Sequence, residues 1–261
     1  MRRGRGGAWL LAASLGNIAF LYLPIAVLVV YSFNAANLAA TWQGFSFEWY
    51  RLLAQDYALA VALQNSLLIA AASTLIATPL GVGAAIGLER LPGRRPAWLD
   101  TALLVPLVMP EVLMGVALLL LFVLVKMPLG LLTVTIGHAA FNIPLVMVVV
   151  RARVRRIDPQ LEEAARDLGA TPWQALRRVT LPLLRPAIVG ASLLAFTVSL
   201  DDFVVTFFTA GPGATTLPLK VYSMIKTGIS PEINALSAIL VLVSMGLVAL
   251  SLLVQKRGVN G

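Results

Sequence analysis

Three carboxylates lie within apolar stretches of this 261-residue chain. Asp201 and Asp202 are adjacent in FTVSLDDFVVTFF, and Glu111 follows Pro110 in PLVMPEVLMG. An ionisable side chain inside a membrane is costly, so it usually faces a bundle interior or an aqueous path and marks the route of an ion or a substrate. A path with three carboxylates and no buried Lys or Arg suits a cation, whereas it would repel phosphate, sulfate or a carboxylate substrate.

The two aspartates are expected to play different roles. Neighbouring residues on a helix point about 100° apart, so at most one of them can point squarely into a path. We favour Asp201 for that role, and Asp202 can then cap the break before TAGPGATTLP, whose glycines and proline end the helix. In the alternative interpretation, both aspartates only cap helix ends or pair with Lys220.

Glu111 is expected at a break in its own span. Pro106 and Pro110 interrupt that segment, so a helix can restart with Pro110 at its first position and Glu111 in its first turn. Broken helices are tolerated at membrane depth where they line a cavity. Alternatively, or in addition, Glu111 satisfies the amide donors that the break leaves free.

Aromatic residues near these carboxylates can contribute to a cation path. Phe203 and Tyr222 are candidate members, because an aromatic ring can hold an ammonium group by a cation–π contact. Packing or an interfacial belt is the more ordinary role of aromatics in such a region, which also contains Phe207 and Phe208.

The composition places these residues in a membrane protein. The chain is 59% hydrophobic and only 12% charged, whereas soluble domains contain about 25% charged residues. It has no cysteine, which excludes disulfides, thiolate catalysis and cysteine-based metal sites. His138 is the single histidine, so no metal site is expected, and we interpret it as a packed or hydrogen-bonded residue of a span. Asn65, Ser66 and Asn142 are expected to hydrogen-bond across helices.

Hydropathy predicts an all-α polytopic membrane protein with six transmembrane helices, since about 20 apolar residues cross the hydrocarbon core. The expected spans are 8–33, 62–88, 101–125, 129–150, 186–208 and 234–254. Together they form one domain over residues 1–261, with a first helix and core helices from 62 to 254. The first apolar run is longer than the core of a signal peptide, so we interpret it as an uncleaved helix, with a signal peptide as the alternative.

The basic residues predict the orientation. With the N-terminus in the cytoplasm, sixteen of the 20 Lys and Arg residues fall on the cytoplasmic side, as the positive-inside rule requires. Both termini are then cytoplasmic. The net charge of +8 is accordingly a topology signal and does not indicate nucleic-acid binding.

The longest cytoplasmic loop covers residues 151–185 and is expected to hold two short helices. In PQLEEAARDLG, Asp158 can cap the first helix and Gly169 suits a left-handed stop. In TPWQALRRV, Thr171 is a cap for the second helix, and Pro182 is expected to end it. Their apolar face either packs on the protein's own helix ends or docks in the groove of a soluble partner.

This loop resembles the signature of permease subunits of bacterial ABC importers. The signature combines Glu-Ala-Ala, a glycine four residues on, and an aliphatic residue two positions before Leu-Pro. The chain matches it with Glu163, Ala164, Ala165, Gly169, Val179, Leu181 and Pro182. The family more often has Ile where Val179 stands. The resemblance implies that these residues couple the permease to an ATPase, and that the fold is that of type I importer permeases.

The segment from SLDDFVVTFF to INALSAIL, with PLVMPEVLMG and FNIPLVMVVVRAR, is similar to the second permease subunit of spermidine/putrescine importers. The implied function is translocation of a polyamine across the bacterial inner membrane. The implied partners are a sister permease, two ATPase subunits that bind the ATP and Mg²⁺, and a periplasmic substrate-binding protein. No cofactor is expected in this chain. Permeases for ferric iron, thiamine or opines share the general pattern and are the alternatives.

Other classes fit less well. An intramembrane aspartyl protease needs two carboxylates from different helices that share a proton, and adjacent aspartates on one helix cannot form that dyad. A secondary transporter usually carries an internal repeat, and none is evident. The chain has no P-loop sequence, so any ATP hydrolysis is expected on a separate subunit.

Overall fold

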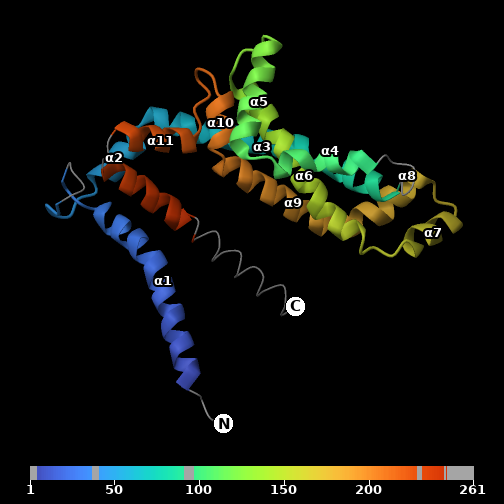
Figure 1. Cartoon of the computed structure of the whole chain (residues 1–261), viewed down its shortest axis with the longest axis horizontal. Helices are drawn as coiled ribbons and strands as arrows, with labels where there is room; N and C mark the ends of the chain where they lie inside the picture. The colour runs from blue at the N-terminus through green and yellow to red at the C-terminus, as the bar shows by residue number, and fades with distance from the viewer. Residues whose placement is uncertain (1–4, 37–40, 91–96, 228–230, 244, 246–261) are drawn as a thin grey trace. The chain divides into compact units, whose positions relative to one another are not determined.

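The computed structural model describes residues 5–36, 41–90, 97–227, 231–243 and 245, and its regular elements are helices (Figure 1). The helices are α1 (Arg5–Tyr31), α2 (Glu48–Gln55), α3 (Tyr57–Arg90), α4 (Ala97–Val108), α5 (Glu111–Leu124), α6 (Leu131–Val154), α7 (Gln160–Asp167), α8 (Pro172–Ala175), the π-helical turn η1 (Leu176–Thr180), α9 (Leu181–Asp201), α10 (Val204–Thr209) and α11 (Leu217–Thr227). The all-α prediction is confirmed.

Within the described ranges, four helical stretches are long and apolar enough to cross a membrane. They are α1, α3, α6 and the continuous run Pro172–Asp201, and the bent pair α4 and α5 makes a fifth if it counts as one span. A shorter apolar helix covers Pro231–Val243, and the remainder of the expected sixth span falls outside the described residues, apart from Met245. The number six therefore stays a prediction.

The chain divides into two compact units, residues 60–220 and residues 1–59 with 221–261. In the second of these, Leu53 of α2 packs with Ala235 and Leu236, while the apolar surface of α1 is exposed. Such a largely apolar, uncovered helix suits contact with lipid or another subunit. That all 261 residues form one permease domain stays a prediction.

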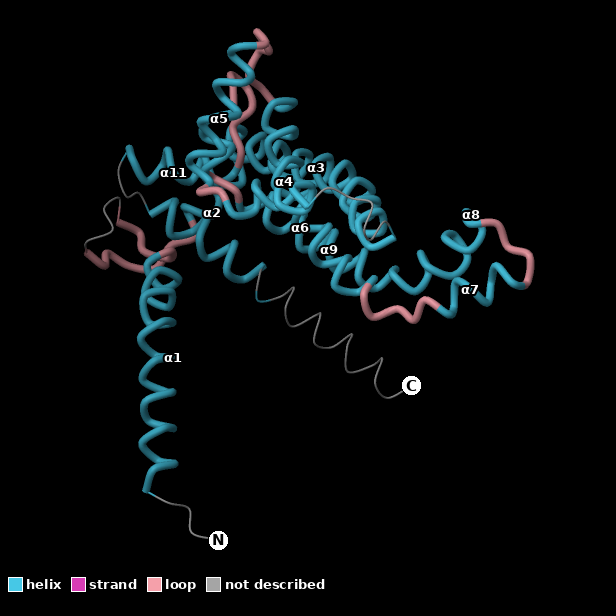
Figure 2. The backbone as a smooth tube through the Cα atoms, turned by 45° about the vertical axis from the view of Figure 1, so that its right-hand side comes forward, coloured by secondary structure: helices cyan, strands magenta, loops and turns pink. Residues whose placement is uncertain are grey.

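The core of the 60–220 unit lies where α3, α6 and α9 run side by side, as the tube in Figure 2 shows. Its buried residues include Val82, Val146, Met147, Leu184 and Ala191. Small side chains such as Ala191 allow the close helix approach that is typical of membrane bundles. This packed core fixes α6 and α9, which carry the polar residues described below.

The second helix of the 151–185 loop does not end at Pro182, contrary to the prediction. It continues through η1 and α9 to Asp201. Proline cannot donate a backbone hydrogen bond and normally disturbs the preceding turn. Here that turn is π-helical, with Leu181 N donating to Leu176 O, and a wider turn absorbs the disturbance without stopping the helix.

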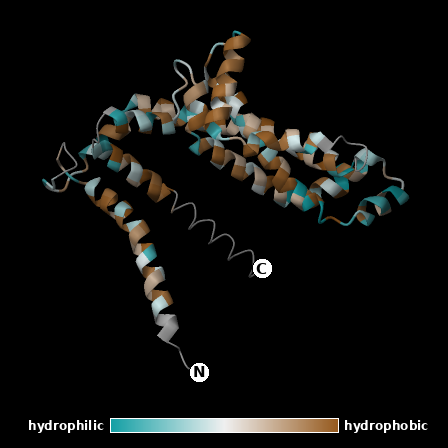
Figure 3. Ribbon diagram, viewed as in Figure 1, coloured by the Kyte–Doolittle hydropathy of each residue, from teal (hydrophilic) through white to brown (hydrophobic). Residues whose placement is uncertain are grey.

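Hydropathy is distributed unevenly over the 60–220 unit (Figure 3). The far part of α5 is strongly apolar and exposed, with Leu120, Leu121, Val123 and Leu124 on its surface. By contrast α7 is largely hydrophilic and has no buried residue. Exposed leucines suit a lipid or subunit contact, and an uncovered polar helix suits an aqueous partner.

Candidate functional site

The fifth predicted span, 186–208, is interrupted at its two aspartates. Helix α9 ends at Asp201, Asp202 is extended with φ −66° and ψ 127°, and α10 begins at Val204. The break therefore lies at Asp202 and Phe203, earlier than the glycines to which the sequence pattern assigned it. The two aspartates consequently do not lie on one continuous helix.

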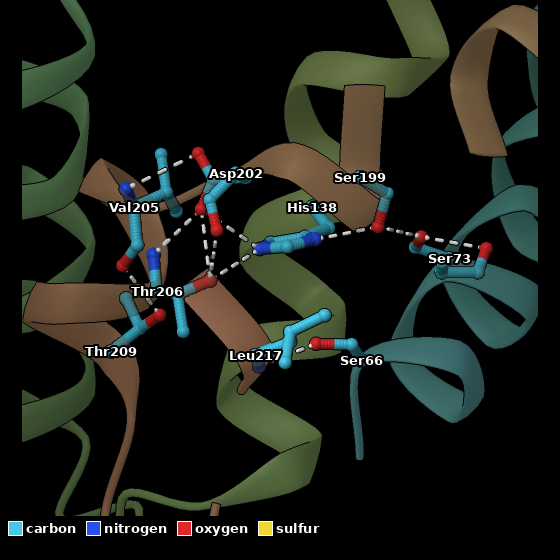
Figure 4. Close-up of polar contacts among 10 residues, drawn as sticks. Ser66, Ser73, His138, Ser199, Asp202, Val205, Thr206, Thr209 and Leu217 are labelled. Carbon is cyan, nitrogen blue, oxygen red and sulfur yellow. Dashed lines mark hydrogen bonds and ion pairs between the residues drawn. The ribbon is translucent and has the colours of Figure 1, made fainter. Parts of the chain in front are cut away.

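Asp202 caps the new helix and is held by several donors (Figure 4). Its Oδ2 accepts hydrogen bonds from Thr206 N at 2.9 Å and Thr206 Oγ1 at 2.8 Å, and Oδ1 accepts from Val205 N at 3.4 Å. His138 Nε2 lies 3.1 Å from Oδ2. Because the Asp202 side chain is only 7% exposed, these donors replace the water that an ionised carboxylate would otherwise need.

His138 of α6 connects this cap to the bundle. Its Nε2 also lies 2.9 Å from Thr206 Oγ1, and its Nδ1 lies 2.6 Å from Ser199 Oγ on α9. Ser199 Oγ is 3.0 Å from Ser73 Oγ on α3. The prediction that His138 is a packed, hydrogen-bonded residue of its span is confirmed, since it is 1% exposed. Its partnership with Asp202 was not foreseen.

The second break lies between α4 and α5, which meet at an angle of 103° around Met109 and Pro110. As predicted, Glu111 lies in the first turn of α5, where a negative charge is favourable. The break coincides with Pro110, whereas Pro106 lies inside α4 and does not interrupt it, contrary to the prediction. Pro110 precedes the helix as its N-cap, so the prediction that it takes the first helical position is wrong. Further along α5, an added Cβ on Gly115 would lie 2.6 Å from the Phe208 ring, so glycine permits the close approach of α5 and α10.

A cavity of about 570 Å³ opens between the two breaks. Glu111, Asp201, Asp202 and Phe203 all line it, together with Pro106, Leu107, Met109, Met114, Phe141, Leu145, Thr197, Val198, Val204 and Val205. The structure thus brings together four of the five predicted path residues. This lining contains three carboxylates and no Lys or Arg, which is the charge pattern that suits a cation.

The three carboxylates differ in their surroundings. Asp201 and Glu111 are exposed, and in the described part of the chain neither side chain has a hydrogen-bond or ion-pair partner. Neither aspartate pairs with Lys220 there. The alternative, that both aspartates only cap helix ends or pair with Lys220, therefore holds for Asp202 alone, which is a cap. Asp201 and Glu111 present their carboxylates to the cavity.

The aromatic candidates are divided. Phe203 lies on the cavity, with its ring centroid 5.6 Å from that of Phe207. Tyr222 lies on α11, among the residues of the other unit, and is 42% exposed. Its membership of a path stays a prediction.

The predicted coupling loop has the expected local structure. Asp158 Oδ1 accepts from Gln160 N at 3.0 Å, at the start of α7. Gly169 has φ +89°, a conformation that side chains disfavour. Thr171 and Gln174 form a reciprocal capping box at the start of α8.

The signature residues occupy two environments. Glu163 and Ala164 are exposed on α7, and Gly169 is exposed in the turn. Leu181 packs against the helical core, and Pro182 is exposed in the first turn of α9. The exposed members are available to a partner, whereas Leu181 ties the loop to the bundle. Their coupling role stays a prediction.

Charged residues whose pairing the sequence did not predict anchor this loop. Glu162 of α7 accepts from Arg90 at 2.5 Å, from Arg166 at 2.9 Å and from Thr180 Oγ1 at 3.0 Å. The neighbour of Arg90, Glu89, accepts from Arg151 at 2.5 Å. The clustering of both charge signs at the predicted ends of spans is the only sequence signal that points to such pairs.

Polar residues inside the other spans have varied partners. Asn65 Nδ2 donates to Gly213 O at 3.0 Å and Thr215 O at 2.9 Å, so it holds a loop rather than a neighbouring helix. Ser66 Oγ accepts from Leu217 N at 2.8 Å. Asn142 is buried without a hydrogen-bond partner among the described residues, and the interhelical bond predicted for it is wrong. Within the described ranges, no cluster of His, Asp and Glu residues could hold a metal ion.

The chain is similar to known transport proteins over most of its length. Residues 77–257 match the family described as binding-protein-dependent transport system inner membrane component. The chain is 40% identical over 243 residues to the spermidine/putrescine transport system permease protein PotC of Escherichia coli (strain K12), covering 93% of this chain and 92% of PotC. It is 44% identical over 250 residues to the putrescine transport system permease protein PotI of the same strain, covering 92% of this chain and 88% of PotI.

A similar chain occurs among solved structures. In the crystal structure of a bacterial alginate ABC transporter in complex with an alginate pentasaccharide-bound periplasmic protein, the similar chain superposes with a TM-score of 0.72. The superposition covers 95% of this chain and 94% of that chain, at 19% identity. At this identity, the likeness establishes a shared permease fold and nothing about the solute.

Proposed function

Because the chain belongs to the family of binding-protein-dependent transport system inner membrane components, we propose that it is the permease subunit of an ATP-driven importer for a polyamine, spermidine or putrescine. The observation that carries the proposal is the 40% and 44% identity to two polyamine permeases, over nearly the whole chain. The acidic cavity is independent support, because a polyamine is a flexible polycation.

The cavity chemistry fits such a cargo. Asp201 and Glu111 offer two carboxylates, unpaired within the described part of the chain, to ammonium groups, while Phe203 offers an aromatic ring. One contact between unit charges at 4 Å contributes about 1 kcal/mol in water and about 4 kcal/mol at an effective dielectric constant of 20. A few such contacts suffice for selectivity and remain weak enough to let the solute move on.

The loop from α7 to η1 is the proposed coupling element. Glu163, Ala164 and Gly169 would meet an ATPase subunit, and Leu181 with Pro182 would pass its movement into α9. ATP and Mg²⁺ would be bound by a dimer of that ATPase and not by this chain. A sister permease would complete the path, and a periplasmic binding protein would deliver the solute. Both termini would lie in the cytoplasm, as the basic residues favour.

Uptake would proceed by alternating access. Closure of the ATPase dimer would move α7 and α8, and α9 would carry that movement to the break at Asp202. The cavity beside this break would then open outward to receive the cation and later inward to release it. The residues of this chain bind, orient and conduct the solute, and no covalent step takes place on it.

The test is a solute panel with the reconstituted complex of this chain, its sister permease, the ATPase and the binding protein. We expect ATP-dependent uptake of labelled spermidine or putrescine, and no uptake of thiamine, an opine or ferric iron. A single panel separates the alternative functions, since each of these three solutes is the substrate of one related class of permeases. Uptake of any of those three solutes without polyamine uptake would refute the proposed substrate and leave the family unchanged.

A further inference from the structure

The pair of His138 and Asp202 needs a physical reason to lie where it does. The two side chains are 1% and 7% exposed, and an ionisable pair in such a place costs free energy unless every polar atom has a partner. Both Asp202 oxygens accept hydrogen bonds, and both ring nitrogens of His138 have oxygen neighbours within 3.1 Å. The site is therefore fully satisfied by the protein itself.

The surrounding hydroxyls satisfy His138 in either protonation state. An ionised carboxylate only accepts, so Nε2 carries a proton and donates to Asp202. In neutral His138, Ser73 donates to Ser199, and Ser199 donates to Nδ1. In protonated His138, Nδ1 donates to Ser199, Ser199 donates to Ser73, and Ser73 donates to Ala70 O at 3.3 Å. The contact between His138 and Asp202 is retained in both cases.

A nucleophilic role for this cluster does not fit. Serine, histidine and aspartate are the components of a hydrolytic triad, and His138 here contacts both Ser199 and Asp202. Ser199, however, is 3% exposed and its hydroxyl is engaged by Ser73 and His138. No substrate carbonyl can reach it, so the cluster acts on the structure of the cavity.

The contact has a direct consequence for the cavity. Asp202 is held extended, which ends α9 and turns the chain into α10. Asp201, the last residue of α9, is left exposed on the cavity wall, with no partner among the described residues. We propose that His138 is a positioning residue of the transport path: it holds Asp202 in the break, so that Asp201 is the aspartate that meets the transported cation.

The charged groups around His138 agree with this division of roles. Asp202 faces it from the break between α9 and α10, whereas α3 and α9 contribute the uncharged Ser73 and Ser199. Asp201 and Glu111 line the cavity. In the described ranges, neither forms a hydrogen bond or an ion pair with His138. Removing His138 should therefore act on the cavity through Asp202 and not through a direct charge effect on the cation.

Two amide substitutions test the proposal with matched chemistry. In His138→Gln, the amide nitrogen takes the place of Nε2 and can still donate to Asp202. In His138→Asn, the shorter side chain places its amide near Ser199 and out of reach of Asp202. We expect His138→Gln to keep polyamine uptake within about twofold of wild type, and His138→Asn to raise KM about tenfold, a change equivalent to 1.4 kcal/mol.

A double-mutant cycle adds a readout that a packing role would not move. If His138 acts through Asp202, His138→Asn should have little further effect in an Asp202→Asn background. Asn142→Leu is the control, because Asn142 lies one turn along α6 and its buried amide has no partner in the described part of the chain. Equal effects of the Gln and Asn variants, or fully additive effects in the cycle, would overturn the proposal.

The uptake assay rests on the proposed function, so a second measurement avoids any transported solute. The chain has no cysteine, so Asp201→Cys introduces a single thiol that a cationic methanethiosulfonate reagent can label in the assembled complex. We expect the labelling rate of this thiol to change about tenfold with His138→Asn and to stay at the parent value with His138→Gln and Asn142→Leu. A constant rate in all three would refute the positioning role. Failure of polyamine uptake by wild type would refute the proposed substrate alone.

Discussion

The two ends of α9 leave the regular helix in opposite ways. Before α9, the π-turn η1 keeps the helix continuous across Pro182, so movement in the loop can pass into α9. After α9, the chain breaks completely at Asp202 and restarts as α10. A continuous helix transmits a displacement, while a capped break provides a wall whose side chains can be placed independently.

The charged pairs at the two ends of α9 also differ in their exposure to solvent. The ion pairs around Glu162 are partly exposed, with side-chain exposures of 33% for Arg90 and 21% for Glu162. The contact of His138 with Asp202 is almost fully buried. Partly exposed pairs exchange readily with water and partners, and buried ones are broken only at high cost. The exposure of the loop pairs suits contact with a partner, whereas the buried contact of His138 with Asp202 keeps the break in one geometry.

The largest effect is expected in the loop, from Gly169→Val. Gly169 has φ +89°, and a β-branched residue forced into a sparsely populated conformation costs on the order of 1–3 kcal/mol. The turn between α7 and α8 would have to move, so we expect ATP-dependent uptake to fall more than tenfold, with ATPase activity no longer stimulated by the loaded binding protein.

Gly83→Val is the matched control for this prediction. Gly83 is an exposed glycine of α3, and an added Cβ there meets no atom within 4 Å. In the Asp201→Cys background, thiol labelling should be unaffected by Gly169→Val, because the break is held by its own contacts. Wild-type uptake with Gly169→Val would remove the loop from the coupling route.

A smaller but specific effect is expected at the break, from charge removal in the cavity. Asp201→Asn and Glu111→Gln keep the shape of the side chain and remove one cavity carboxylate each. Uptake of polyamine should fall about tenfold in each case, mainly through KM. Asp202→Asn can still accept from Thr206 N through its amide oxygen, and it should affect folding yield more than KM.

The assay is uptake of labelled polyamine, with expression and basal ATPase activity as controls. If Asp202→Asn raised KM as much as Asp201→Asn, the contrast between the two aspartates would be lost. If none of the three carboxylates mattered, the cation path would have no support beyond the similarity to polyamine permeases.

Local signals in the sequence account for a large part of this structure. Hydropathy predicted the long apolar helices α1, α3 and α6, and the break before Glu111 followed from Pro110, which cannot donate a backbone hydrogen bond. Gly169 and Thr171 predicted the turn and the cap of the loop, because both effects are confined to neighbouring residues.

The features that were missed depend on distant residues. Asp202 at the break contacts His138 of α6, which also contacts Ser199 at a separation of 61 positions. No local pattern reveals which donor a buried carboxylate will meet. Pro182 looked like a helix stop because its effect on the preceding turn is local, while the packing of Leu181 and Leu184 against the core is not. Periodicity and turn chemistry predict elements, and tertiary contacts decide where these elements bend.

The smallest effect is expected for Arg90→Gln, which removes one of three partners of Glu162. A partly exposed pair contributes up to about 1 kcal/mol, and Arg166 and Thr180 remain to hold the carboxylate. We therefore expect uptake by Arg90→Gln to fall by no more than about fivefold. In the double variant Arg90→Glu with Glu162→Arg, which exchanges the two charges, uptake should recover part of this loss.

Arg51→Gln serves as the control for this last variant, since the contact of Arg51 with Glu48 is long, at 3.9 Å, and its side chains are 71% and 62% exposed. It should behave as wild type in the same uptake assay. A loss with Arg90→Gln as large as that with Gly169→Val would mean that the loop depends on a fixed ion pair, as the break does on the contact between His138 and Asp202. The two ends of α9 would then be stabilised in the same way, because each would depend on a single charge contact that water cannot replace.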